Sequence, residues 1–145
     1  MTATGTAQPI HATAVALFCS GGWHGALLRG PSGAGKSDLA LRLMASGWRL
    51  IGDDYVHAWA SGGALYAAPV DTIAGRVEAR GLGIVSRPHR LASRIVLVVD
   101  CARQAVERLP EPQTASISGV IVARLTLDIR PASAVETLRL AIRRL

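Results

Sequence analysis

Eight consecutive residues in the first third of the chain have the types and spacing of a phosphate-binding site. They are Gly30, Pro31, Ser32, Gly33, Ala34, Gly35, Lys36 and Ser37. This run matches the phosphate-binding loop pattern G-x-x-x-x-G-K-[ST] at every fixed position. Its glycines let successive backbone N–H groups turn inward as a nest for phosphate oxygens. In such a loop Lys36 contacts the β- and γ-phosphates of a nucleotide, and the Ser37 hydroxyl ligates Mg²⁺.

The flanking segments have the composition that positions such a loop. Residues 26–29 predict a short strand leading in, and residues 36–46 predict a helix leading out, with apolar residues at helical spacing. Gly47 follows as a predicted helix cap. Lys36 is the only lysine among 16 basic residues. This usage indicates that the position needs a compact ammonium group rather than a planar guanidinium.

Two acidic positions are candidates for binding the metal and for accepting a proton. Asp53 and Asp54 end a predicted strand over residues 48–52, and α/β folds bind ligands at strand ends. Asp100 ends the apolar run 94–100, which predicts a buried parallel strand and has the pattern of a Walker B segment. Spacing alone leaves both positions open, and a solvated acidic turn at the double aspartate is equally compatible with it.

The remaining N-terminal half predicts strands and turns. Residues 10–18 predict a first strand that carries His11 near its start. Residues 55–60 and 64–68 flank a Ser-Gly-Gly turn and predict a β-hairpin. Residues 77–85 hold a carboxylate, a guanidinium and two glycines, and they predict a tight connection.

The C-terminal part predicts one more strand and one more helix. Residues 103–109 predict a short helical turn, and residues 110–118 predict a polar loop. Residues 119–129 alternate apolar and polar side chains and predict the last strand. Ser133 and Glu136 have the spacing of a capping box at the start of the final helix.

Length and charge restrict the class of protein. The 145 residues suit one compact domain, predicted over 10–145 after a flexible lead-in over 1–9. The formal net charge is +6, but the arginines are scattered and no basic block or stacking motif is present, so nucleic acid is not a predicted partner. The charge suits an anionic nucleotide and an acidic protein partner.

No segment predicts a membrane anchor or a secretory signal. The longest apolar run, 95–99, is too short to span a bilayer, and residues 1–9 lack the pattern of a signal peptide. Cys19 and Cys101 form neither a C-x-x-C pair nor a zinc-ligand pattern, so they are predicted to be buried thiols. A cytoplasmic protein without membrane association is expected.

Taken together, these motifs resemble one family. His11, the loop 30–37, the run 50–54 and the run 78–84 (Glu-Ala-Arg-Gly-Leu-Gly-Ile) resemble the catalytic domain of bacterial HPr kinase/phosphorylase. The resemblance extends over nearly the whole chain from His11 on, and the E-x-R-G-L-G-I segment is its most specific part. It implies an α/β, P-loop-containing domain of the phosphoenolpyruvate-carboxykinase-like class, with a mixed central β-sheet flanked by helices.

The resemblance also implies roles for single residues. It assigns Asp54 as the base that takes the proton from a serine hydroxyl, and it places His11 beside that carboxylate. Lys36 is then a phosphate contact, and Ser37 and Glu78 are the magnesium ligands. Arg108, in the run Glu-Arg-Leu, is similar to the family's active-site arginine.

The implied reaction uses ATP and Mg²⁺ to phosphorylate a serine of HPr or an HPr-like phosphocarrier, with dephosphorylation as a second activity. Family members assemble as hexamers, so a homo-oligomer is expected. The chain is similar to the C-terminal half of full-length members, so a short single-domain form is expected. Residues 128–133 replace the basic loop that the family associates with dephosphorylation, which favours the kinase activity.

Two other functions remain compatible with the loop. A small-molecule kinase would use the same phosphate chemistry, but the chain has no Arg-rich insertion that would form a lid. A non-catalytic nucleotide-sensing module would bind ATP without turnover. Assays of phosphate transfer to the phosphocarriers of the same organism separate these functions.

Overall fold

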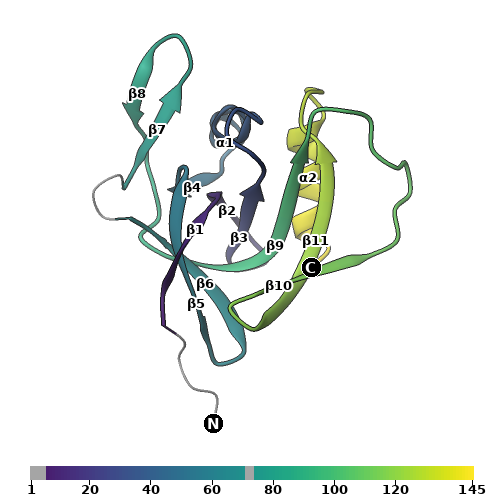
Figure 1. Ribbon diagram of the computed structural model, residues 1–145. Helices are drawn as coiled ribbons and strands as arrows, with labels where there is room; N and C mark the ends of the chain where they lie inside the picture. The colour runs from purple at the N-terminus through teal and green to yellow at the C-terminus, as the bar shows by residue number, and fades with distance from the viewer. Residues whose placement is uncertain (1–5, 71–73) are drawn as a thin grey trace.

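The computed structural model of the chain describes residues 6–70 and 74–145 (Figure 1). It has an α/β fold in which most elements are strands. In chain order the elements are β1 (Gln8–His11), β2 (Thr13–Cys19), β3 (Gly22–Arg29), α1 (Lys36–Ala45), β4 (Arg49–Gly52), β5 (Tyr55–Ser61), β6 (Ala64–Pro69), β7 (Arg76–Ala79), β8 (Gly83–Ser86), β9 (Ser93–Ala102), β10 (Gln113–Ile117), β11 (Val120–Asp128) and α2 (Ala134–Arg143). Neither helix of this described part is long and apolar enough to cross a membrane.

Within the described ranges, nine strands form one mixed sheet around the long strand β9. The order runs β1-β5-β6-β9-β3-β2-β4, and β11 joins at β9 with β10 beside it. β9 is parallel to β3 and β11 and antiparallel to β6, so the predicted parallel strand at residues 94–100 is confirmed. The predicted tight connection at residues 77–85 is the β7–β8 hairpin, which projects from the sheet beside α1 (Figure 1).

The sheet buries apolar side chains on both faces. One face packs against both helices, through residues such as Leu39 and Leu43 of α1 and Leu138 and Ile142 of α2. On the other face β5 and β6 bend around the sheet (Figure 1). Leu65 of β6 is buried there in one cluster with Ala14 of β2 and Leu27 of β3. The helices therefore cover one face of the sheet. The carboxyl ends of β3 and β9 lie beside the phosphate-binding loop, since the loop follows β3 and Gly30 lies near Cys101.

The predicted first strand is in fact two strands. β1 pairs with β5, whereas β2 pairs with β3 and β4. The chain changes neighbours at Ala12, whose N–H donates to the Asp54 carbonyl at 3.0 Å. β1 begins at Gln8, inside the segment 1–9 that the sequence assigned to a lead-in, and residues 1–5 of that segment lie outside the described residues.

The helix and turn predictions around the first half are confirmed. α1 ends where predicted, and Gly47 has a φ of 96°. Trp48 N–H donates to the Leu43 carbonyl at 3.2 Å, the hydrogen bond that closes such a glycine-terminated helix. The predicted β5–β6 hairpin also forms, and the two glycines of its turn have positive φ.

Three predictions in the C-terminal part are wrong. Residues 103–109 form no helix, and the predicted polar loop contains the strand β10. β10 and β11 are joined by Ser118 and Gly119, with φ of 51° and 79°, and two successive positive φ angles are typical of the two-residue turns that match strand twist. Ser133 precedes α2, but it has helical dihedrals and its side chain makes no capping hydrogen bond, so the capping box is not formed.

Candidate active site

The phosphate-binding loop lies between the end of β3 and the start of α1, as predicted. Gly33 and Gly35 have φ of 83° and 100°, a region in which side chains are strained. A Cβ on Gly35 would lie 3.1 Å from Arg103 Nη1, and a Cβ on Gly30 would lie 3.3 Å from that of Ala34. The glycines are therefore needed both for the curl of the loop and for its close packing.

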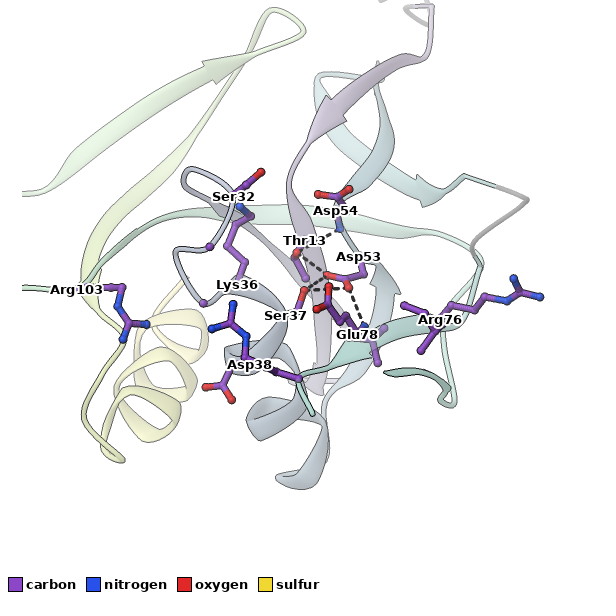
Figure 2. A pocket seen from close by; sticks show the side chains of 15 residues that line it. Thr13, Ser32, Lys36, Ser37, Asp38, Asp53, Asp54, Arg76, Glu78 and Arg103 are labelled. Carbon is purple, nitrogen blue, oxygen red and sulfur yellow. Dashed lines mark hydrogen bonds between the residues drawn. The ribbon is translucent and has the colours of Figure 1, made fainter. Parts of the chain in front are cut away.

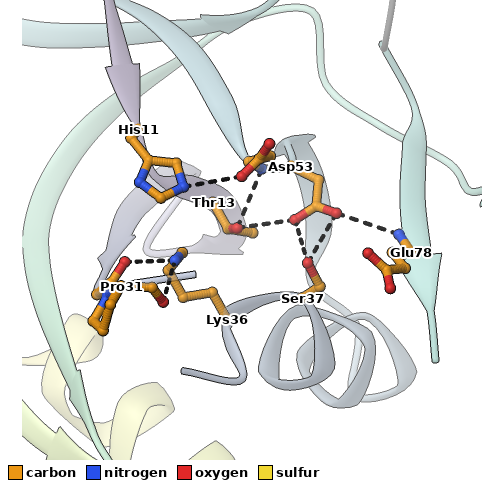
Figure 3. A network of polar contacts seen from close by, with 9 residues as sticks. His11, Thr13, Pro31, Lys36, Ser37, Asp53 and Glu78 are labelled. Carbon is orange, nitrogen blue, oxygen red and sulfur yellow. Dashed lines mark hydrogen bonds and ion pairs between the residues drawn. The ribbon is translucent and has the colours of Figure 1, made fainter. Parts of the chain in front are cut away.

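Lys36 is folded into this loop and is only 6% exposed. Its Nζ donates to the Gly30 carbonyl at 2.6 Å and to the Pro31 carbonyl at 3.0 Å (Figure 3). These two bonds fix the ammonium group inside the curve of the loop. Lys36 therefore brings a positive charge to the loop side of the pocket that it lines.

Asp53 is the buried member of the double aspartate, and its carboxylate is the centre of a hydrogen-bond network (Figure 3). Ser37 Oγ donates to both of its oxygens, at 2.7 and 2.9 Å. Thr13 Oγ1 donates at 2.9 Å, and the Glu78 backbone N–H donates at 3.3 Å. The network joins α1, β2 and β7 around one negative charge.

Asp54 lies beside this network with its side chain 63% exposed. His11 Nε2 lies 2.9 Å from Asp54 Oδ1, where a ring N–H donates to the carboxylate. Asp54 has a φ of 68°, and the Tyr55 N–H donates to the Asp53 carbonyl at 2.7 Å across it. Such a three-residue turn with positive φ is rare and strained. It turns the carboxylate of Asp54 away from that of Asp53.

Asp100, the other acidic candidate, is held by two arginines. Arg29 Nε donates to it at 2.9 Å and Arg124 Nε at 2.6 Å. Partial burial raises the pKa of Asp100, but the hydrogen bonds and charges of the two arginines outweigh it and hold the pKa below its ordinary value. The next residue, Cys101, is a thiol whose pKa burial raises to about 12, so it stays protonated at neutral pH.

An open pocket of about 730 Å³ lies over the loop (Figure 2). Its lining includes Lys36, Ser37, Asp53, Asp54 and Glu78, and not Asp100. The double aspartate therefore borders the predicted phosphate site. The structure thus brings together the candidates from the loop, the double aspartate and the β7–β8 hairpin.

Arginine side chains from three parts of the chain also line the pocket, namely Arg76, Arg80 and Arg103. Arg76 carries its guanidinium away from the acidic group, whereas Arg103 lies on the far side of the loop (Figure 2). Arg103 Nη1 is 3.5 Å from the Ala34 carbonyl. Arg108 is exposed in the segment after β9 and is not among the described residues that line the pocket.

The pocket lining includes one hydroxyl and two carboxylates that could hold a magnesium ion. They belong to Ser37, Asp53 and Glu78, and Ser37 is hydrogen-bonded to Asp53. No cluster of three or more His, Cys, Asp or Glu suited to a metal occurs in the described part of the chain. Mg²⁺ bound with a nucleotide needs no such cluster, because one or two carboxylates and the phosphates complete its ligands.

The comparisons with known proteins agree with this geometry. The family model described as the HPr Serine kinase C-terminal domain matches residues 5–142. The chain belongs to this family. The HPr kinase/phosphorylase of Chromobacterium violaceum is 34% identical, over 72% of this chain and 38% of the relative. That of Clostridium botulinum (strain Eklund 17B / Type B) is also 34% identical, over 74% of this chain and 39% of the relative.

A solved structure shows the same fold. The structure described as the Hpr(Ser) kinase/phosphatase from Coxiella burnetii has a TM-score of 0.76 and 20% sequence identity, and the match covers 94% of this chain and 99% of that one. At this identity the likeness concerns the fold. The chain spans about two fifths of the length of the curated relatives it matches.

Two polar residues of the pocket were not predicted from the sequence. Thr13 lies in the predicted strand over residues 10–18, where a threonine between two alanines is a polar residue among small and apolar side chains. Arg103 fell in a predicted helical turn, although it comes three residues after Asp100 at the end of a predicted parallel strand. That position is the signal that could have found it.

Proposed function

We propose that this chain is the catalytic domain of an ATP-dependent serine protein kinase that phosphorylates HPr or an HPr-like phosphocarrier. The observation that carries the proposal is the exposed carboxylate of Asp54, hydrogen-bonded to His11 at the edge of a pocket that a phosphate-binding loop forms. Family membership supports the same reaction. The family also implies a cytoplasmic homo-oligomer.

ATP is the proposed donor, with Mg²⁺ as its metal. Phosphoryl transfer depends mainly on positioning and on neutralising the charge of the γ-phosphate. The loop N–H groups and Lys36 bind the phosphates. Ser37, Asp53 and Glu78 would hold Mg²⁺, which when bound supplies further positive charge at the phosphates. Arg103 adds a guanidinium at the outer side of the loop.

Asp54 is the proposed base. The serine oxygen forms a bond to the γ-phosphorus, its proton passes to Asp54, and the bond from the γ-phosphorus to the bridging oxygen breaks, so that ADP leaves with the electron pair. A positioned base of this kind contributes about 10²- to 10⁴-fold to the rate. The hydrogen bond from His11 fixes the orientation of this exposed carboxylate at the pocket.

Dephosphorylation would use the same carboxylate in reverse. In the segment 128–133, Asp128 is paired with Arg130 at 2.9 Å, so the one acidic and one basic charge largely neutralise each other. This segment is therefore not the basic loop that the family resemblance associates with dephosphorylation. We propose the kinase direction as the main activity.

The test is incubation with ATP, Mg²⁺ and the phosphocarriers of the same organism, with mass spectrometry of the carriers. We expect one phosphoserine. Asp54→Asn should lower the transfer rate at least about 10²-fold while ATP still binds, because the hydrogen bonds of Asp54 go to His11, Thr13 and Ala12 and not to the loop. Asp100→Asn serves as the matched control and should retain transfer. Transfer to no carrier, or loss in the Asp100 variant alone, would refute the proposal.

A further inference from the structure

One buried hydroxyl contacts both members of the double aspartate. Thr13 begins β2 and is fully buried. Its Oγ1 donates to Asp53 Oδ1 at 2.9 Å and accepts from the Asp54 backbone N–H at 3.4 Å (Figure 3). A threonine hydroxyl has one proton to give and lone pairs to accept with, so both bonds form at the same time. Among the side chains of this network, that of Thr13 alone is bonded to both aspartates.

One bond holds the carboxylate of Asp53 in place, and the other supports the backbone conformation of Asp54. The bond to Asp53 comes from β2, so it holds that carboxylate independently of the helix that carries Ser37. The bond from the Asp54 N–H supports a residue with a φ of 68°, a conformation that persists only where the surroundings enforce it. The Ala12 N–H bond to the Asp54 carbonyl supports the same turn.

We propose that Thr13 is a positioning residue for both aspartates. It fixes Asp53 against Ser37 for binding the magnesium–nucleotide complex, and it holds Asp54 in the turned conformation that faces the acceptor. The first role rests on the proposed binding of ATP with Mg²⁺, and the second rests in addition on the proposed transfer to a serine. The first role concerns binding and is testable without any phosphocarrier.

The experiment compares Thr13→Val, which keeps the shape and removes the hydroxyl, with Thr13→Ser, which keeps the hydroxyl. Binding of a non-hydrolysable ATP analogue is measured by calorimetry, once with Mg²⁺ and once with EDTA. We expect Thr13→Val to lower the affinity with Mg²⁺ about tenfold, the usual effect of losing a hydrogen bond to a charged group. Affinity in EDTA should stay unchanged, because the hydroxyl of Thr13 is bonded to the two aspartates and not to the loop.

The same variants are then assayed for transfer. Thr13→Val should lower kcat about tenfold or more with a smaller change in the KM for the carrier, because it displaces the base rather than a carrier contact. Thr13→Ser should recover most of both losses. A purely structural role would lower binding equally with and without Mg²⁺ and would show no rescue by serine.

Wild-type behaviour of Thr13→Val in both assays would overturn the inference, and so would equal defects in the valine and serine variants. If the valine variant does not fold, as judged by circular dichroism, Thr13→Ala removes the same hydroxyl without adding bulk and is read in the same way. If wild-type protein phosphorylates no carrier, the proposed function fails, but the split between Mg²⁺ and EDTA still decides the role of Thr13 toward Asp53.

Discussion

Lys36 places a compact ammonium group in a narrow, buried position that a guanidinium does not fit. Its Nζ fits between the Gly30 and Pro31 carbonyls, and the residue is only 6% exposed. A planar guanidinium is larger and needs donors arranged in a fork. We therefore expect Lys36→Arg to weaken ATP binding at least about tenfold although the charge is kept. Calorimetry with ATP and Mg²⁺ measures the affinity. The control is Arg49→Lys, the opposite exchange at the exposed start of β4.

Wild-type affinity in Lys36→Arg would show that charge alone matters at this position. A loss of affinity in Arg49→Lys of the same size would show instead that the fold, and not the loop, is sensitive to such exchanges. The composition of the chain agrees with a special need for lysine at this site, since every other basic residue is an arginine.

Arg103 and Arg108 make a direct comparison. Arg103 lines the pocket beside the loop, whereas Arg108 does not line it. We expect Arg103→Ala to weaken ATP binding about three- to tenfold, because it removes a cation near the phosphates. Arg108→Ala should leave ATP affinity unchanged, even if the family role of that arginine lowers transfer to the carrier. If a binding titration showed weaker ATP binding in Arg108→Ala and unchanged binding in Arg103→Ala, the placement of both residues would be contradicted.

At the scale of the elements, Asp100 joins three adjacent strands. Asp100 is on β9, Arg29 is on β3 and Arg124 is on β11, and these strands are parallel neighbours. Arg29 is also the last residue before the phosphate-binding loop. The three charges therefore stabilise the packing of these three strands against one another.

This ion-pair cluster predicts a pH-dependent stability. The pKa of Asp100 is lowered in the folded protein, so its contribution is present above the ordinary value of 3.8 and is lost as the pH falls through the lower folded value. We expect Asp100→Asn to lower the free energy of unfolding by about 1 kcal/mol at pH 7. The difference from wild type should shrink below about pH 4. Urea unfolding at pH 7 and pH 3 measures it, and a difference that does not narrow would contradict the account.

The elements also show which features the sequence could predict. The loop, α1 and the β5–β6 hairpin were predicted correctly because their signals are local: glycine positions and helical or alternating spacing. Thr13 and Arg103 were missed because their positions depend on pairing between distant strands, β2 with β4 and β9 with β3. β10 was missed because it is short and largely exposed, so its composition is that of a loop.

For the whole molecule, the β7–β8 hairpin is the feature that suggests assembly. It pairs with no other strand in the described ranges, and Val77 anchors it in the core that contains α1. Leu82 and Ile84 on this hairpin are 78% and 66% exposed. A two-stranded hairpin is marginally stable by itself, and its exposed apolar side chains would be buried by a contact with another chain, although Ile84 also lines the pocket.

We therefore predict a homo-oligomer in which a neighbouring subunit covers this hairpin, as the family resemblance implies for a hexamer. Light scattering at micromolar concentration should give a multiple of the 15.2 kDa chain mass. Leu82→Ser should lower that mass, because it removes apolar area from the contact surface. Leu140→Ser, on the exposed face of α2, removes a similar area outside the hairpin and should leave the mass unchanged. A monomeric wild type would show that the hairpin is exposed in solution. Equal effects of the two substitutions on the mass would show that assembly does not depend on the hairpin.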